Sequence, residues 1–92
     1  MQLKGPFKLT EQNLYFVPSK PGAYLLGNEH GNVVYVGMSD ANLASRLRDH
    51  LKAGHVEATQ FWYSDTWSPQ EAADLSKNLT IKYAPSRNTV AR

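Results

Sequence analysis

The chain has 92 residues, of which 41% are hydrophobic and 20% charged, and it contains no cysteine. This composition is typical of one folded domain and argues against a disordered chain, a disulfide scaffold or a thiolate metal site. The net charge of +2 is too small for a bulk polycation, and no apolar run approaches the roughly 20 residues that span a bilayer. We expect a single cytoplasmic domain over residues 1–92, with no membrane partner.

The first half of the chain predicts a short helix and a hairpin. Thr10 can cap a helix over Glu11–Phe16, inside an N-terminal extension of residues 1–20. Ala23–Leu26 reads as a strand. Val33–Gly37 is dense in β-branched and aromatic side chains, and it reads as the hairpin partner of the first strand across a turn-rich loop.

The second half predicts helix, strand and helix. Leucines at helical spacing mark a helix over Asn42–Ala53, and Thr59–Ser64 reads as a third strand. The last helix begins at the capping box of residues 68–71, with a proline at its first position, and it ends before Pro85. The expected fold class is α+β, with a small three-stranded antiparallel sheet flanked by helices.

Two short glycine–tyrosine motifs are followed by an arginine and a histidine. Tyr24 and Tyr35 lie on neighbouring strands, and on one face if the hairpin register pairs them. Arg46 and His50 are four residues apart, on one face of the next helix. A phenol can donate a hydrogen bond to water or phosphate, and a guanidinium can meet two phosphate oxygens at once. The joint spacing indicates recognition of a phosphodiester or chemistry on it, although each residue alone is more often structural.

Two basic segments could add phosphate contacts. Arg48 and Lys52 lie close to Arg46 in sequence, and residues 77–92 carry four basic side chains, including Arg87, with no acid. Each patch alone is as consistent with a solvated helix face or tail. Basic patches of this size suit a few phosphate contacts.

A run of aromatic side chains could stack on bases, as in proteins that bind single strands. Phe61, Trp62 and Tyr63 stand in the third predicted strand, of which at least one face must pack in a small domain. We expect Phe61 and Tyr63 to be core residues. The roles of Trp62 and Trp67 stay open.

Four short motifs follow one another between Pro21 and Asn88. They are Pro21-Gly22-Ala23-Tyr24, Val34-Tyr35-Val36-Gly37-Met38-Ser39, Arg46-Leu47-Arg48-Asp49-His50-Leu51 and Pro85-Ser86-Arg87-Asn88. In this order they resemble the GIY-YIG nuclease family over nearly all of the chain. The strand motifs alone are weak signals, but the helix motif and the Pro-x-x-Asn end make the resemblance specific.

The resemblance implies an α/β sandwich that hydrolyses one nucleic-acid strand with a single divalent metal, Mg²⁺ or Mn²⁺. It implies that Tyr24 helps to position or activate the attacking water and that Tyr35 holds the water or the phosphate. Arg46 would stabilise charge on the phosphorane, with His50 as its helper. Asn88 would lie near the scissile phosphate or fix the tail.

Ser76 stands where the resemblance implies the glutamate that binds the metal, nine residues before Pro85. A neutral hydroxyl is a weak Mg²⁺ ligand, because oxygen sites for this ion normally include a carboxylate. Asp74 is about 200° around the helix from Ser76, and Glu71 is engaged by the capping box. Neither acid is expected to replace the missing ligand.

The sequence therefore predicts a GIY-YIG-type endonuclease domain that is impaired at Ser76. The alternative is a catalytically degenerate module on the same fold that binds nucleic acid or a protein. The expected partner is nucleic acid, with DNA ahead of RNA, and a protein partner stays open. The expected cofactor is Mg²⁺ or Mn²⁺ if the domain is active, and otherwise none.

Overall fold

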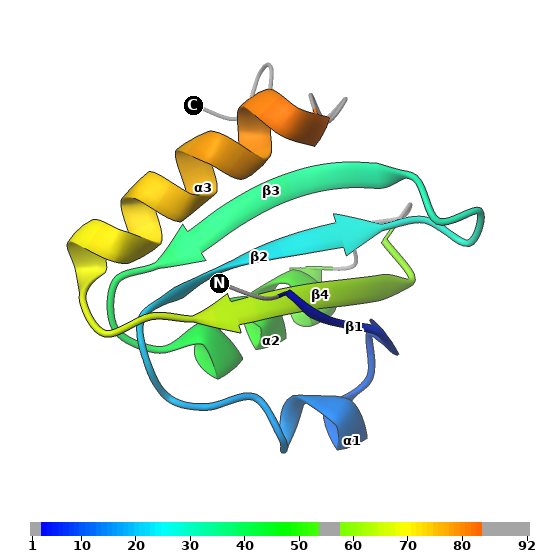
Figure 1. The fold of residues 1–92 in the computed structure, drawn as a ribbon. Coiled ribbons are helices and arrows are strands. Elements are labelled where there is room, and N and C mark those ends of the chain that lie inside the picture. Colours follow the sequence, from blue (N-terminus) through cyan, green and yellow to red (C-terminus); the bar gives the residue numbers. More distant parts are fainter. Residues whose placement is uncertain (1–2, 54–57, 84–92) are drawn as a thin grey trace.

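The computed structural model describes residues 3–53 and 58–83. Within them the chain forms four strands and three helices (Figure 1). In chain order they are β1 (Lys4–Lys8), α1 (Glu11–Leu14), β2 (Gly22–Gly27), β3 (Val33–Ser39), α2 (Leu43–Ala53), β4 (Gln60–Asp65) and α3 (Pro69–Tyr83).

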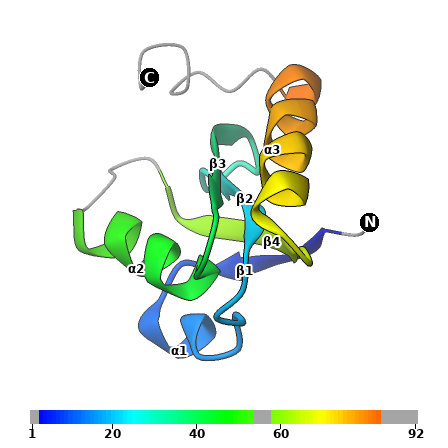
Figure 2. The same ribbon diagram turned by 90° about the vertical axis from the view of Figure 1, so that its left-hand side faces the viewer.

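The strands form one antiparallel sheet in the order β1-β4-β2-β3, so β2 is central and β3 is an edge strand. Helices α1 and α2 cover one face of this sheet, and α3 covers the other (Figure 2). All six residues of β2 are buried, because both faces of this strand are covered. The α+β class predicted from the sequence is confirmed.

The sheet has four strands rather than the three expected. The additional strand, β1, lies in the segment expected to be an extension, and it pairs with β4 through Lys4–Tyr63, Phe7–Phe61 and Lys8–Gln60. All five of its residues are exposed. Its sequence therefore carries no alternation of buried and exposed side chains, and backbone pairing with β4 is what makes it a strand.

Two hydrophobic cores lie on the two faces of the sheet. The larger core joins the sheet to α1 and α2 through Leu14, Leu43, Leu47 and the rings of Tyr24 and Phe61. The smaller core joins it to α3 and consists of Ala23, Leu25, Val36 and Leu79, with Leu75 and Trp62 packed against them.

No helix within residues 3–53 and 58–83 is long and apolar enough to cross a bilayer.

Candidate phosphodiester site

The hairpin register places Tyr24 and Tyr35 on the same face of the sheet. Tyr24 pairs with Gly37, and Tyr35 pairs with Leu26, so the two tyrosines are diagonal rather than direct neighbours. Because the two pairs are two residues apart, their side chains share a face. The rings are stacked, with centroids 6.2 Å apart and an interplanar angle of 28°.

Gly37 leaves the space that the Tyr24 ring occupies. A Cβ atom at this position would clash with the Tyr24 hydroxyl group and would stand 2.5 Å from its ring carbon Cζ and 2.9 Å from the Tyr35 ring. A glycine in a strand often marks such a close approach. The position of the Tyr24 ring thus explains why residue 37 is a glycine.

His50 completes a buried hydrogen bond with Tyr24. The Tyr24 hydroxyl oxygen lies 2.6 Å from His50 Nε2, and the tautomer of the imidazole decides which group donates. The Tyr24 side chain is fully buried, and His50 is 9% exposed. The centroid of the His50 ring is also 4.9 Å from that of Tyr35, so one histidine contacts both tyrosines.

The surroundings of Tyr24 keep its phenol protonated. Burial raises the pKa of Tyr24 well above its ordinary value of 10.0, and the neighbouring Tyr35 acts in the same direction. The charge of Arg46 and its hydrogen bond to the phenol lower the pKa, but desolvation is the larger effect. At neutral pH Tyr24 is therefore a neutral hydrogen-bonding group.

Arg46 and Tyr35 form the outer part of this cluster. Arg46 is exposed on α2, one turn before His50, and Tyr35 is partly buried on the edge strand β3. The structure therefore brings together all four residues that were predicted as catalytic. We call Tyr24, Tyr35, Arg46 and His50 the tyrosine cluster.

The other predicted contacts are not all in this cluster. Arg48 Nε lies 3.2 Å from Glu11 Oε1, so the guanidinium group faces α1. Lys52 is exposed in the last turn of α2. The predicted contacts Arg87 and Asn88 lie outside the described residues.

Ser76 is partly buried on α3, and α2 and α3 lie on opposite faces of the sheet (Figure 2). The two acids on the same helix are engaged elsewhere. Glu71 Oε1 accepts from the backbone N–H of Trp67 at 2.8 Å, and an Asp74 oxygen accepts from Gln70. No group of three His, Cys, Asp or Glu side chains that could hold a metal ion occurs in the described ranges. The donor set around Ser76 therefore does not fit Mg²⁺, which prefers carboxylates.

The aromatic side chains of the third predicted strand pack in or against the core, whereas Trp67, which follows the strand, is exposed. Phe61 is fully buried and Tyr63 is 6% exposed, as expected for core residues, and Trp62 is partly buried and packs against the smaller core. Trp67 is 86% exposed, and its ring lies under the ammonium group of Lys20, at 4.4 Å from the ring centroid. Sequence reasoning did not select Lys20, because only the fold brings it to Trp67.

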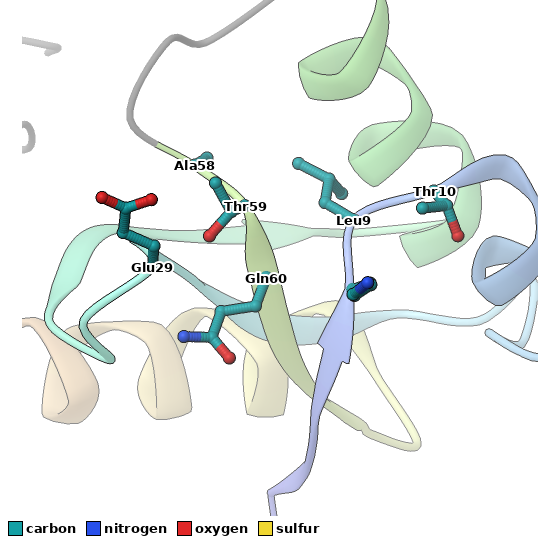
Figure 3. A pocket seen from close by; sticks show the side chains of 7 residues that line it. Leu9, Thr10, Glu29, Ala58, Thr59 and Gln60 are labelled. Carbon is teal, nitrogen blue, oxygen red and sulfur yellow. The ribbon is translucent and has the colours of Figure 1, made fainter.

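A pocket of about 570 Å³ lies at the opposite end of the sheet from Trp67, where β1 ends and β4 begins (Figure 3). The side chains of Glu29, Thr59 and Gln60 line it, together with Lys8 and its neighbours. No member of the tyrosine cluster is in this lining. This pocket is thus separate from the candidate site on the hairpin and α2.

The chain is similar in sequence to the UvrABC system protein C of several bacteria. It is 35% identical to the UvrABC system protein C of Oenococcus oeni over 88% of this chain, and 36% identical to that of Clostridium kluyveri over 89% of it. It spans only 14% and 15% of the lengths of these curated relatives.

The fold is similar to a solved nuclease domain. That domain is the GIY-YIG N-terminal endonuclease domain of UvrC from Thermotoga maritima, bound to its catalytic divalent cation, magnesium. The TM-score is 0.71 at 28% identity, and the match covers 84% of this chain and 92% of that one. Residues 1–90 match the sequence pattern of a family described as a domain of unknown function (DUF7508). The chain belongs to this family and, with the fold and motifs above, to the GIY-YIG superfamily.

Proposed function

We propose that this domain binds a nucleic-acid phosphodiester through the tyrosine cluster and that its endonuclease activity is impaired at Ser76. The observation that carries the proposal is the convergence of two stacked tyrosines, a buried histidine and an exposed arginine on one face of the hairpin. The relationship to the endonuclease domain of UvrC supports nucleic acid as the substrate class.

The burial of Tyr24 gives the two tyrosines different roles. Tyr24 has no exposed surface, so it holds His50 in place and does not itself reach the substrate. Tyr35 and Arg46 are the members that solvent reaches, and they would contact the phosphate. The planar guanidinium group of Arg46 would bind two phosphate oxygens and stabilise the charge that develops on phosphorus.

Ser76 limits the chemistry that the cluster can perform. In the family a divalent cation supplies Lewis-acid stabilisation, and a hydroxyl group at this position does not hold Mg²⁺ or Mn²⁺ as a carboxylate would. The missing stabilisation is worth several kcal/mol, which is on the order of a thousandfold in rate. We therefore propose slow cutting at most, and binding as the retained activity.

A module that binds without cutting is the second candidate, and the donor set at Ser76 favours it. Such a module could bind a protein instead of a nucleic acid. Phe7, Phe16 and Tyr63, with Asn13, line a pocket of about 220 Å³, and Phe16 is 80% exposed. If wild type binds a nucleic-acid strand and Arg46→Ala does not, the partner is nucleic acid rather than protein.

Among nucleic acids we propose DNA rather than RNA, and a cytoplasmic location stays a prediction.

A nicking assay tests the proposal. Supercoiled plasmid and labelled single strands are incubated with wild type, Ser76→Glu and the neutral control Ser76→Gln, in Mg²⁺, Mn²⁺ or EDTA. We expect little or no cutting by wild type and Ser76→Gln. In Ser76→Glu we expect a gain on the order of a thousandfold in Mg²⁺, abolished by EDTA, because the new carboxylate can bind the cation.

Two further variants test whether the tyrosine cluster is the site of cutting. Tyr24→Phe and Tyr35→Phe, each combined with Ser76→Glu, should remove the gained activity. Metal-dependent cutting by wild type that Tyr24→Phe abolishes would show instead an active enzyme with a substitute ligand. A correctly folded Ser76→Glu protein without any gain would mean that the defect extends beyond this position.

A further inference from the structure

Trp67 is exposed to a degree that its size makes unusual. Its side chain is 86% exposed, although a tryptophan can bury about 150–250 Å² of mostly apolar surface. Trp62, five residues earlier, is partly buried and packs against the smaller core. Packing thus covers part of one tryptophan and almost none of the other.

The segment that carries Trp67 is fixed to the rest of the domain. The backbone N–H of Thr66 donates to the carbonyl oxygen of Pro21 at 2.7 Å, and the Thr66 hydroxyl donates to that of Ser68 at 2.9 Å. The N–H of Trp67 itself donates to Glu71 Oε1 at 2.8 Å. The backbone of Trp67 is therefore held on both sides.

A lysine ammonium group lies over the indole ring. The ammonium group of Lys20 lies 4.4 Å from the centroid of the ring, which is a cation–π contact. Lys20 and Lys4 share a single carboxylate, that of Asp65, at 3.5 and 4.0 Å. Two ammonium groups thus share one carboxylate near the exposed ring, and the Glu71 carboxylate accepts from the backbone N–H of Trp67. An ammonium group over an exposed aromatic ring suits a phosphate with its base.

This surface lies at the end of the sheet from which β2 and α2 lead to the tyrosine cluster. The end of β4, the start of β2 and the start of α3 meet at one end of the sheet, where Asp65 pairs with Gly22 (Figure 1). Tyr24 is two residues beyond Gly22 on β2, roughly 7 Å along the strand. The N–H of Leu43, the first residue of α2, donates to the Lys20 carbonyl at 3.0 Å, and Arg46 follows one turn later.

We propose that Trp67 and Lys20 form a stacking platform for an unpaired base of a nucleic-acid strand whose backbone runs to the tyrosine cluster. Trp67 stacks on the base, and Lys20 and Lys4 contact the flanking phosphates. The platform makes the domain prefer single strands, because a paired base cannot lie flat on the ring. This inference rests on the proposed function, from which it is separable by experiment.

Fluorescence anisotropy with a labelled thymidine oligonucleotide of about 12 nucleotides tests the platform. The same strand with abasic sites and a duplex of equal length serve as competing probes. Trp67→Ala should weaken binding of the intact strand by about 5- to 150-fold, the range for loss of one stacked base. Trp67→Phe should retain most of the affinity. Wild type and Trp67→Ala should bind the abasic strand equally.

Tyr15→Ala is the matched control, because Tyr15 is also 86% exposed but lies beside α1. This variant should bind as wild type does. Unchanged binding by Trp67→Ala, together with weak binding by Arg46→Ala, would overturn the platform and leave the proposed function standing. The reverse pattern would support the platform and overturn the role of Arg46. A dimer in sedimentation that depends on Trp67, without strand binding, would assign the surface to a protein contact and overturn the platform.

Discussion

At the scale of single residues, two tyrosines on one face of a hairpin differ in burial, and burial decides their chemistry. Tyr24 is enclosed and hydrogen-bonded to His50, whereas Tyr35 is partly exposed on the edge strand. A buried phenol resists ionisation, because its anion would lose hydration. Tyr24 is therefore suited to fix the histidine, and Tyr35 is suited to meet a substrate.

The raised pKa of Tyr24 predicts an alkaline loss of stability. Above pH 10.0, the ordinary pKa, the unfolded chain releases the phenolic proton while the folded chain keeps it. The unfolded state then binds fewer protons, so the free energy of unfolding falls as pH rises, by up to about 1.4 kcal/mol per pH unit from this residue. This contribution is fully present below pH 10.

Denaturant unfolding of wild type and Tyr24→Phe between pH 8 and 11.5 measures this effect. Tyr24→Phe should be less stable at pH 8, by about 1–3 kcal/mol, because His50 loses a buried partner. The difference should shrink above pH 10, because phenylalanine has no proton to release. Tyr15→Phe, at an exposed position, should lose stability as steeply as wild type. Parallel curves for wild type and Tyr24→Phe would contradict the raised pKa.

At the scale of the elements, β3 and α2 together build the candidate site. Edge strand β3 supplies Tyr35 and the space at Gly37, and α2 supplies Arg46 and His50 one turn apart. Leu43 and Leu47 anchor α2 in the larger core, and this fixes the turn that carries the two polar side chains. The site depends on contacts between elements more than on any one of them.

Substitution of Gly37 should disturb this junction. In Gly37→Ala the new methyl group would overlap the Tyr24 hydroxyl, so Tyr24 must move away from His50. We expect a loss of about 1–3 kcal/mol in stability, typical of overpacking, and weaker strand binding. Thermal unfolding and anisotropy measure both effects.

Gly31→Asn is the control for this substitution. Gly31 lies in the hairpin loop at a φ of 84°, with no atom within 4 Å of a built Cβ. Asparagine tolerates this backbone region, so stability and binding should change little. If both variants lose stability and binding equally, the loss in Gly37→Ala comes from replacing a glycine and not from the contact with Tyr24.

At the scale of the whole molecule, few positive charges are available for a nucleic acid. The net charge is only +2, Arg48 pairs with Glu11, and Lys4 and Lys20 share the one carboxylate of Asp65. Arg46 makes no ion pair with any residue in 3–53 or 58–83, the parts of the chain that the structure describes. Affinity should therefore come from a small number of phosphate contacts and not from the overall field.

Measurements of affinity for a nucleic-acid strand at several salt concentrations test this distribution of charge. Arg46→Ala should weaken binding and reduce the slope of log affinity against log salt by about 0.7, the value for one phosphate contact on a single strand. Arg48→Ala should change the slope less, because its guanidinium group pairs with Glu11. It should also cost at most about 1 kcal/mol in stability, as exposed ion pairs do. An unchanged slope in Arg46→Ala would remove Arg46 from the site.

The sequence alone determined the elements whose signals are local. The hairpin, the leucine stripe of α2 and the capping box of α3 were all predicted close to their observed bounds, because periodicity and caps are properties of neighbouring residues. In α3 the hydroxyl of Ser68 accepts from the N–H of Glu71, as a capping box requires. The Glu71 side chain reaches Trp67 instead of the cap residue.

Only the tertiary structure decided the features that arise between distant segments. Strand β1 forms because β4 offers it backbone partners, and its exposed Lys-Gly-Pro sequence carries no buried face. The motifs placed Tyr24 and His50 in one neighbourhood, but sequence spacing says nothing of solvent exclusion. Packing across 26 residues of sequence buried their hydrogen bond, and it also set Lys20 against the exposed Trp67. The burial of side chains and the pairing of residues far apart in the sequence depend on how helices and strands pack together. The local sequence pattern carries no information about that packing.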